Sequence, residues 1–188
     1  MNIKKLIIPI VLVLLFLIIV LWFLNWRNQE KLKELNEPLP KGVSVVKTLT
    51  GKYRVVNKID GYEFKIPDEW EGVKTIEYVA EKTLLDYTAS TIEIEGKRGG
   101  SRILMISRFK LSTPYSNLRK WAENIFDIFG LVGDFTEDKV GEYEIMKTQE
   151  NVHLVGMYVY FFKKTDAVYS VTCGSEEFIK DIISNGTW

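Results

Sequence analysis

The feature that most constrains this chain is an uninterrupted apolar run near its N-terminus. Residues Leu6 to Leu24 are 19 residues without a charged side chain, LIIPIVLVLLFLIIVLWFL. A helix of that length is about 28 Å long, close to the roughly 30 Å hydrocarbon core of a bilayer. Trp22 and Trp26 stand at its far end, where amphipathic rings favour the membrane interface. The run predicts a transmembrane signal anchor over residues 6–24, preceded by a short basic tail over residues 1–5.

Two other interpretations of this run stay open, a cleaved signal peptide and a buried core helix. Signal peptides have an apolar region of about 7–15 residues and a cleavage site of small residues. Here the run is longer, and the residues that follow it, Asn25-Trp26-Arg27-Asn28, do not offer that pattern. We therefore expect an uncleaved, single-pass anchor in the lipid bilayer.

The orientation follows less directly from charge. Lys4 and Lys5 precede the run, but Arg27 and Lys31 follow it, so the flanking bias does not decide the topology. A very short basic tail before an N-terminal apolar run is the usual arrangement of a signal anchor. We expect a cytoplasmic N-terminus at the cell membrane and a C-terminal domain outside.

Residues 25–41 read as a linker. Its middle could extend the membrane helix, but Leu32 and Leu35 are the only apolar residues there, and Pro38 and Pro40 favour an extended spacer. The prediction is a solvated tether. The alternative is a short juxtamembrane helix that dimerises, although the segment lacks sustained heptads.

Residues 42–188 predict one domain with a core of its own, because a domain of this size buries about 68–70% of its unfolded surface. The 25 basic side chains equal the 25 acidic ones, which argues against a nucleic-acid partner. A single cysteine excludes an intramolecular disulfide framework.

The pattern of the domain is mostly period two, with short turns between strands. Two helices interrupt it. Thr113 and Pro114 predict the start of the first helix and Gly130 its end, and the second begins at Ser175 and ends at Asn185-Gly186. The expected fold class is α+β, an antiparallel central sheet with helices packed on its faces. The predicted strands are Val43–Leu49, Tyr53–Val56, Tyr62–Ile66, Val73–Val79, Thr91–Glu95, Arg102–Phe109, Tyr143–Thr148, Val152–Lys163 and Ala167–Cys173.

The order of elements is familiar. A glycine-aromatic strand runs into proline and tryptophan (GYEFKIPDEW, 61–70), a central helix carries Trp121, and a closing hairpin runs into a short helix (159–184). Over about residues 42–188 this order resembles the PsbP-like family, the α/β/α sandwich that the extrinsic photosystem II subunit shares with the Ran-binding factor Mog. The resemblance implies non-enzymatic roles such as binding a larger assembly, and no functional residue of the family matches a position here.

The best candidate for ligand binding is the hairpin tip at Gly96–Gly100. Its glycines free the backbone to approach a ligand, and Lys97, Arg98 and Arg102 could attract an anion. A flexible hairpin tip needs the same residues, and the segment lacks the strand, loop and helix context of a nucleotide site.

Other chemically capable residues favour structural roles. A nucleophilic pair would need Cys173 and His153 in contact with an orienting group, and nothing local supports one. Two acidic clusters could supply oxygen ligands, but neither has the spacing of an EF-hand, so solvated turns are expected. These clusters are Asp134, Glu137, Asp138, Glu142 and Glu144, and Asp68, Glu69 and Glu71.

Together these patterns predict a membrane-anchored, extracytoplasmic binding or scaffolding domain that recruits a protein partner and uses no catalytic residue, metal or cofactor. The first alternative is a small-ligand binder, for an anion or an apolar molecule, with a groove beside the central helix. The second is an enzyme with a dispersed carboxylate site.

Overall fold

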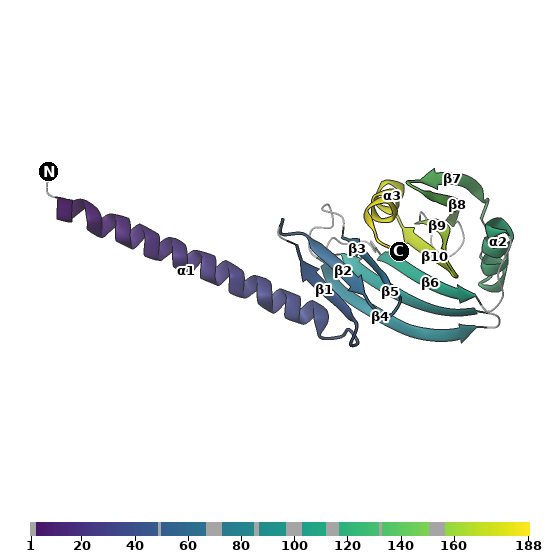
Figure 1. Cartoon of the computed structure of the whole chain (residues 1–188), viewed down its shortest axis with the longest axis horizontal. Helices are drawn as coiled ribbons and strands as arrows, with labels where there is room; N and C mark the ends of the chain where they lie inside the picture. The colour runs from purple at the N-terminus through teal and green to yellow at the C-terminus, as the bar shows by residue number, and fades with distance from the viewer. Residues whose placement is uncertain are drawn as a thin grey trace.

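The structure is a computed structural model that describes residues 3–48, 50–66, 73–84, 87–96, 103–111, 117–131, 133–150 and 157–188. A long N-terminal helix precedes a domain of strands and two further helices (Figure 1). The elements are α1 (Ile3–Asn36), β1 (Val43–Lys47), β2 (Tyr53–Asn57), β3 (Tyr62–Lys65), β4 (Val73–Leu84), β5 (Tyr87–Gly96), β6 (Ile103–Leu111), α2 (Leu118–Ile128), β7 (Thr136–Val140), β8 (Tyr143–Glu150), β9 (Met157–Lys164), β10 (Ala167–Cys173) and α3 (Glu176–Asn185).

The strands form two antiparallel sheets. The large sheet has seven strands in the order β4-β5-β6-β10-β9-β8-β7, and the small sheet has the order β1-β2-β3. Most pairs join strands that follow each other along the chain, and the pairing of β6 with β10 joins strands that are far apart in it. The predicted α+β class, with an antiparallel central sheet and helices on its faces, is confirmed. The small sheet is separate from the large one, a division that the strand pattern alone did not indicate.

Alternation along the strands gives the large sheet two different faces. On β9, Tyr160 and Phe162 pack with the small sheet and α3, whereas Val159 and Phe161 pack with α2. We call the first the inner face and the second the outer face. Because successive side chains of a strand point to opposite sides, each buried strand serves both layers.

The inner face is closed by two elements. Ile179, Ile182 and Ile183 of α3 are buried against it, and the small sheet contributes side chains such as Val55 and Phe64. The end of the chain also joins this layer, since Thr187 pairs with Glu63 on the free edge of β3. Such pairing protects an otherwise open strand edge.

The sequence predicted the start of α3 correctly but not that of α2. Ser175 caps α3 as predicted, accepting a hydrogen bond from the Phe178 amide, and Gly186 follows its last residue. For α2 the cap is Asn117, whose side chain accepts from the Lys120 amide, so the predicted start at Thr113 is wrong. Thr113 and Pro114 lie outside the described residues. Gly130, with φ of +66°, lies just past the end of α2 as predicted.

The acidic segment around residue 138 is a strand pair and not a solvated turn. β7 pairs with β8 through the tight connection at Gly141 and Glu142. The alternation in TEDKV is hard to recognise because β7 is an edge strand with mostly charged side chains.

Helix α1 is long and apolar enough to cross a membrane. In its segment Val11–Asn36 the most apolar window has a mean hydropathy of 2.0, and none of that window is buried against the domain. Signal sequences contain helices of the same kind. The length and composition of α1 support an anchor, but they do not fix its orientation.

The end of α1 is docked on the domain. Leu35 is only 3% exposed, and the Asn36 side chain brackets Val45, donating to its carbonyl over 3.0 Å and accepting from its amide over 2.8 Å. The Lys31 ammonium lies 5.2 Å from the centre of the Tyr53 ring. The solvated tether predicted for this segment is therefore wrong at its helical end. Leu32 and Leu35 are enough to bury this face of α1 because the small sheet provides a surface for them to pack on.

Candidate functional site

A groove opens between α2 and the outer face of the large sheet. Its volume is about 250 Å³. From the helix side it is lined by Ile125, Phe126, Phe129 and Leu131, and from the sheet by Val79, Ala89, Thr91, Met105, Ser107, Phe109, Val159, Phe161, Ser170 and Thr172. Its walls are thus aromatic and aliphatic, while its floor carries hydroxyl groups. A groove lies where one of the sequence hypotheses placed it, beside the central helix.

The groove exists because small side chains meet in register across three strands. Thr91 of β5 is opposite Ser107 of β6, which in turn is opposite Ser170 of β10. The next residue in this row is Phe161 of β9, which packs under α2. A large apolar side chain at any of the three small positions would fill the space beside the helix.

Two floor hydroxyls are enclosed by protein. Ser170 and Thr172 are 6% and 5% exposed. In the described part of the chain neither side chain has a hydrogen-bond partner, whereas Thr91 Oγ1 and Ser107 Oγ lie 2.9 Å apart and bond to each other. Among the described residues the fully buried side-chain atoms without a partner are Tyr62 Oη and Arg108 Nε, so the mostly covered Ser170 and Thr172 still expose their hydroxyls to the groove. The two hydroxyls are therefore available to a bound molecule.

The mouth of the groove is apolar and exposed. Val79 is 46% exposed and Phe129 48% exposed, and both line the groove. Ile128, next to Phe129 on α2, is 39% exposed. Large apolar side chains that gather at a concave surface indicate a place where another molecule binds.

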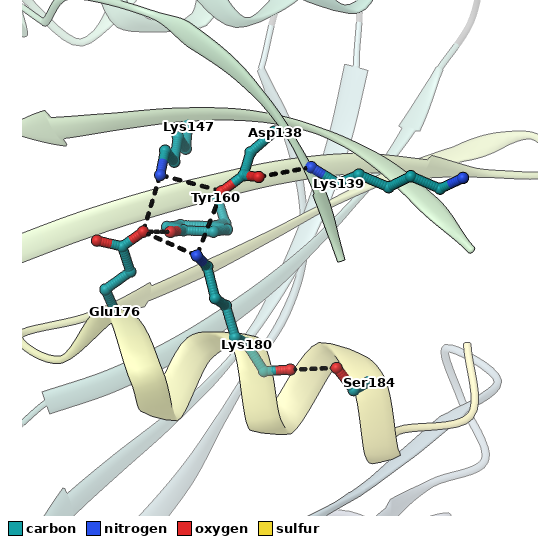
Figure 2. Close-up of polar contacts among 7 residues, drawn as sticks. All are labelled: Asp138, Lys139, Lys147, Tyr160, Glu176, Lys180 and Ser184. Carbon is teal, nitrogen blue, oxygen red and sulfur yellow. Dashed lines mark hydrogen bonds and ion pairs between the residues drawn. The ribbon is translucent and has the colours of Figure 1, made fainter. Parts of the chain in front are cut away.

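A second notable cluster lies on the other side of the sheet and fixes α3 (Figure 2). The Lys147 Nζ lies 2.8 Å from Glu176 Oε1 and 3.0 Å from Asp138 Oδ2. The Lys180 Nζ lies 3.2 Å and 3.4 Å from the same two carboxylates. The buried Tyr160 donates its hydroxyl hydrogen to Glu176. Each charge thus has two opposite charges beside it, and the first turn of α3 is bound to β7, β8 and β9.

The pKa values in this cluster match a structural role. Hydrogen bonding to Lys147 lowers the pKa of Asp138 to about 2, and hydrogen bonds from Lys147 and Tyr160 lower the pKa of Glu176 to about 2. The bond to Glu176 in turn raises the pKa of Lys147. Burial, followed by the bond to Glu176, raises the pKa of Tyr160. At neutral pH both carboxylates and Lys147 are charged and paired, which suits a structural role better than proton transfer. We call Asp138, Lys147, Glu176 and Lys180 the clamp on α3.

Most of the candidate ligand-binding and catalytic residues predicted from the sequence lie where the structure is not described. Lys97, Arg98, Arg102 and His153 lie outside the described residues, as do Asp68, Glu69 and Glu71. Cys173 is described and buried with the inner-face core. Proposals that involve the hairpin tip or His153 therefore stay predictions.

Three members of the other acidic cluster, Asp138, Glu137 and Glu142, have separate basic partners. Asp138 belongs to the clamp on α3, Glu137 lies 4.0 Å from Arg119, and Glu142 lies 3.0 Å from Lys164. The bond to Lys164 lowers the pKa of Glu142. Within the described ranges, no three side chains of His, Cys, Asp or Glu are grouped so that they could hold a metal ion.

Comparison with known proteins does not identify a function for this chain. No family model, curated protein or solved structure matches the chain. The resemblance to the PsbP-like family therefore stays a prediction. The α+β architecture stands on the strand pairing, and the function has to be argued from the groove.

The floor of the groove was missed at the sequence level, although a signal for it exists. In the strand AVYSVTC the apolar residues Ala167, Tyr169, Val171 and Cys173 face the inner core, and Ser170 and Thr172 fall on the alternate positions. Alternation of this kind is normally read as one side facing water. Only the pairing of β10 between β6 and β9 shows that both sides are buried.

Proposed function

We propose that this chain is a membrane-anchored, non-catalytic binding protein that captures a partner protein in the groove beside α2. The observation that carries the proposal is the groove itself, an apolar recess with exposed Val79 and Phe129 at its mouth. On its floor the Ser170 and Thr172 hydroxyls have no partner among the described residues.

The size of the groove favours a protein side chain over a larger ligand. Pockets for drug-sized ligands and cofactors usually have about 300–1,000 Å³. The volume here, about 250 Å³, is below that range. It is well above the roughly 150 Å³ of an engineered cavity that holds benzene. One aromatic anchor from a partner would fill it, and such buried anchors supply most of the energy at protein interfaces.

The anchor would present the groove away from the bilayer. If residues 6–24 span the membrane, the rest of α1, through Asn36, is a stalk about 18 Å long. Because Leu35 and Asn36 dock on the small sheet, the domain cannot swing freely on this stalk. Figure 1 shows α2 at the end of the domain opposite to α1. This arrangement holds the groove at a fixed distance from the membrane surface. We propose a cytoplasmic N-terminus, so that the domain recruits its partner outside.

Photo-crosslinking in intact membranes tests the proposal. A photoreactive residue replaces Phe129 at the groove mouth or, as a control, Ile59, which is 49% exposed and follows β2 in the small sheet. We expect a discrete adduct from position 129 that is absent from position 59. Filling the groove by Ser107→Leu should remove that adduct. Adducts of equal yield at both positions, or an adduct that Ser107→Leu leaves unchanged, would contradict the proposal.

A further inference from the structure

The groove continues into an acidic surface on the same face of the sheet. Its second row of floor residues runs from Thr172 of β10 to Met105 of β6, then to Glu93 of β5 and Glu77 of β4. Neighbouring strands lie about 4.8 Å apart, so Glu93 follows Met105 directly and Glu77 comes one strand later. We call Glu77 and Glu93 the acidic pair.

The acidic pair faces out from the sheet. Ile76 and the neighbours of Glu93, Ile92 and Ile94, are fully buried on the inner face, so the two carboxylates belong to the outer face with the groove. Like charges directly opposite each other on adjacent strands destabilise a sheet. Within the described residues, neither carboxylate has an ion pair or hydrogen bond. The fold therefore keeps an unfavourable pair of charges beside the apolar groove.

Three glutamates elsewhere in the domain have basic partners. Glu63 pairs with Arg54 over 3.1 Å, Glu123 lies 3.5 Å from Arg119, and Glu176 has two lysines. Free carboxylates at the end of the groove would attract a cation that arrives with the occupant. Charge complementarity of this kind selects a partner and speeds its association more than it strengthens binding.

The floor hydroxyls add a requirement on the anchor side chain. Ser170 and Thr172 lie among apolar walls and have accepting lone pairs to offer. Tryptophan and tyrosine are the aromatic side chains that bury a large ring and also carry an N–H or O–H that needs an acceptor. A phenylalanine or leucine anchor would leave both hydroxyls without a partner.

Resting on the proposed function, we infer that the partner presents a segment in which a tryptophan or tyrosine enters the groove and an adjacent lysine or arginine faces Glu77 and Glu93. The ring displaces solvent from the aromatic walls, its polar atom bonds to Ser170 or Thr172, and the neighbouring cation neutralises the acidic pair. The partner is thus a protein with an exposed basic and aromatic segment.

A peptide titration tests this inference on the full chain. The chain is placed in nanodiscs of phosphatidylcholine. The probe is the peptide Gly-Ser-Lys-Trp-Lys-Ser-Gly-amide with fluorescein at its N-terminus, followed by fluorescence anisotropy. Two matched peptides replace the tryptophan by serine or both lysines by glutamate. Empty nanodiscs measure binding to lipid alone. We expect saturable binding of the first peptide only, weakened by salt because the cations lie near the surface.

Two protein variants separate the contributions. The double change Glu77→Gln and Glu93→Gln should weaken the Lys-Trp-Lys peptide about fivefold, as expected for two exposed ion pairs. The matched control removes the same charge at exposed Glu34 and Glu177, away from the groove, and should leave the affinity unchanged. Ser107→Leu should weaken binding by about tenfold or more, because the anchor loses its space.

The outcomes distinguish this inference from the proposed function. Equal affinities for the lysine and glutamate peptides, or no effect of removing the acidic pair, would overturn the inference. Loss of binding in Ser107→Leu alone would at the same time support the groove as a binding site. Binding equal to that of empty nanodiscs, or no binding of any peptide, would also overturn the inference, and the crosslinking at position 129 would then decide the groove on its own.

Discussion

The inner and outer faces of the large sheet use the same strands for different purposes. On the inner face, large side chains such as Ile92, Ile106 and Phe162 meet α3 and the small sheet and leave little space. On the outer face, α2 covers only part of the sheet, and small residues such as Ser107 hold the rest open. The contrast indicates that one face is closely packed, whereas the other leaves the space in which we propose that a partner binds.

The contrast is sharpest at two adjacent residues of β6. Ile106→Ala should lower the free energy of unfolding by about 2–5 kcal/mol, because it leaves a cavity in a closed core. Met105→Ala removes a side chain that borders the open groove and should cost below about 1 kcal/mol. Urea unfolding of the full chain in detergent, followed by tryptophan fluorescence, compares them. Equal losses would mean that the two faces are equally packed.

Loosening α2 should affect only the outer layer. Asn117→Ala removes the cap that accepts from the Lys120 amide, and we expect a loss of about 1 kcal/mol. Hydrogen exchange should then speed up for amides of α2 while those of α3 stay protected. If α3 amides exchanged faster to the same extent, the two helices would form one cooperative unit, and the separation of layers would be lost.

Acid should act mainly on the inner layer, through the clamp on α3. The pKa values of Asp138 and Glu176, about 2 in the folded chain, are below the value of about 4 expected when unfolded. The clamp therefore contributes its full stability above about pH 4 and loses it as the pH falls towards 2.

Replacing one carboxylate of the clamp checks this sign. Glu176→Gln should cost about 0.5–1 kcal/mol at pH 7, the range for partly exposed ion pairs, and almost nothing near pH 2. Thermal unfolding of the unchanged protein and of the Glu176→Gln variant across this pH range measures the difference in stability. A cost that is independent of pH would show that the ionic contacts of Glu176 do not stabilise the fold.

The smallest expected effect has the opposite sign. Replacing both Glu77 and Glu93 by glutamine removes a repulsion between facing carboxylates and should raise stability by about 0.2–0.5 kcal/mol. The matched change at Glu34 and Glu177 should not raise the melting temperature, because Glu177 lies in the first turn of α3, where the helix dipole favours an anion. A lower melting temperature in the first variant would mean that the acidic pair is stabilising and has a cation nearby.

Local signals predicted local structure well. The apolar run indicated α1, and Ser175 and Gly130 marked helix ends that the structure has. The start of α2 was misplaced because Thr113 and Pro114 form a stronger capping pattern than Asn117, although Asn117 caps the helix. The edge strand β7 was missed because its side chains are mostly charged.

What escaped prediction depends on long-range pairing. Leu35 could be assigned to the core only once the small sheet was known to lie beside α1. The groove depends on Thr91, Ser107 and Ser170 meeting in register, although they are far apart along the chain. No single strand carries that information.

The most direct test of the central claim, that the outer face holds an open binding groove, is a methyl NMR titration of the full chain in nanodiscs with indole as the probe. The methyl groups of Met105 and Ile125 line the groove, and that of Ile106 belongs to the closed inner core. We predict saturable shifts at Met105 and Ile125 that Ser107→Leu abolishes, with Ile106 unmoved. Shifts of equal size at Ile106, or none at Met105 and Ile125, would contradict the account.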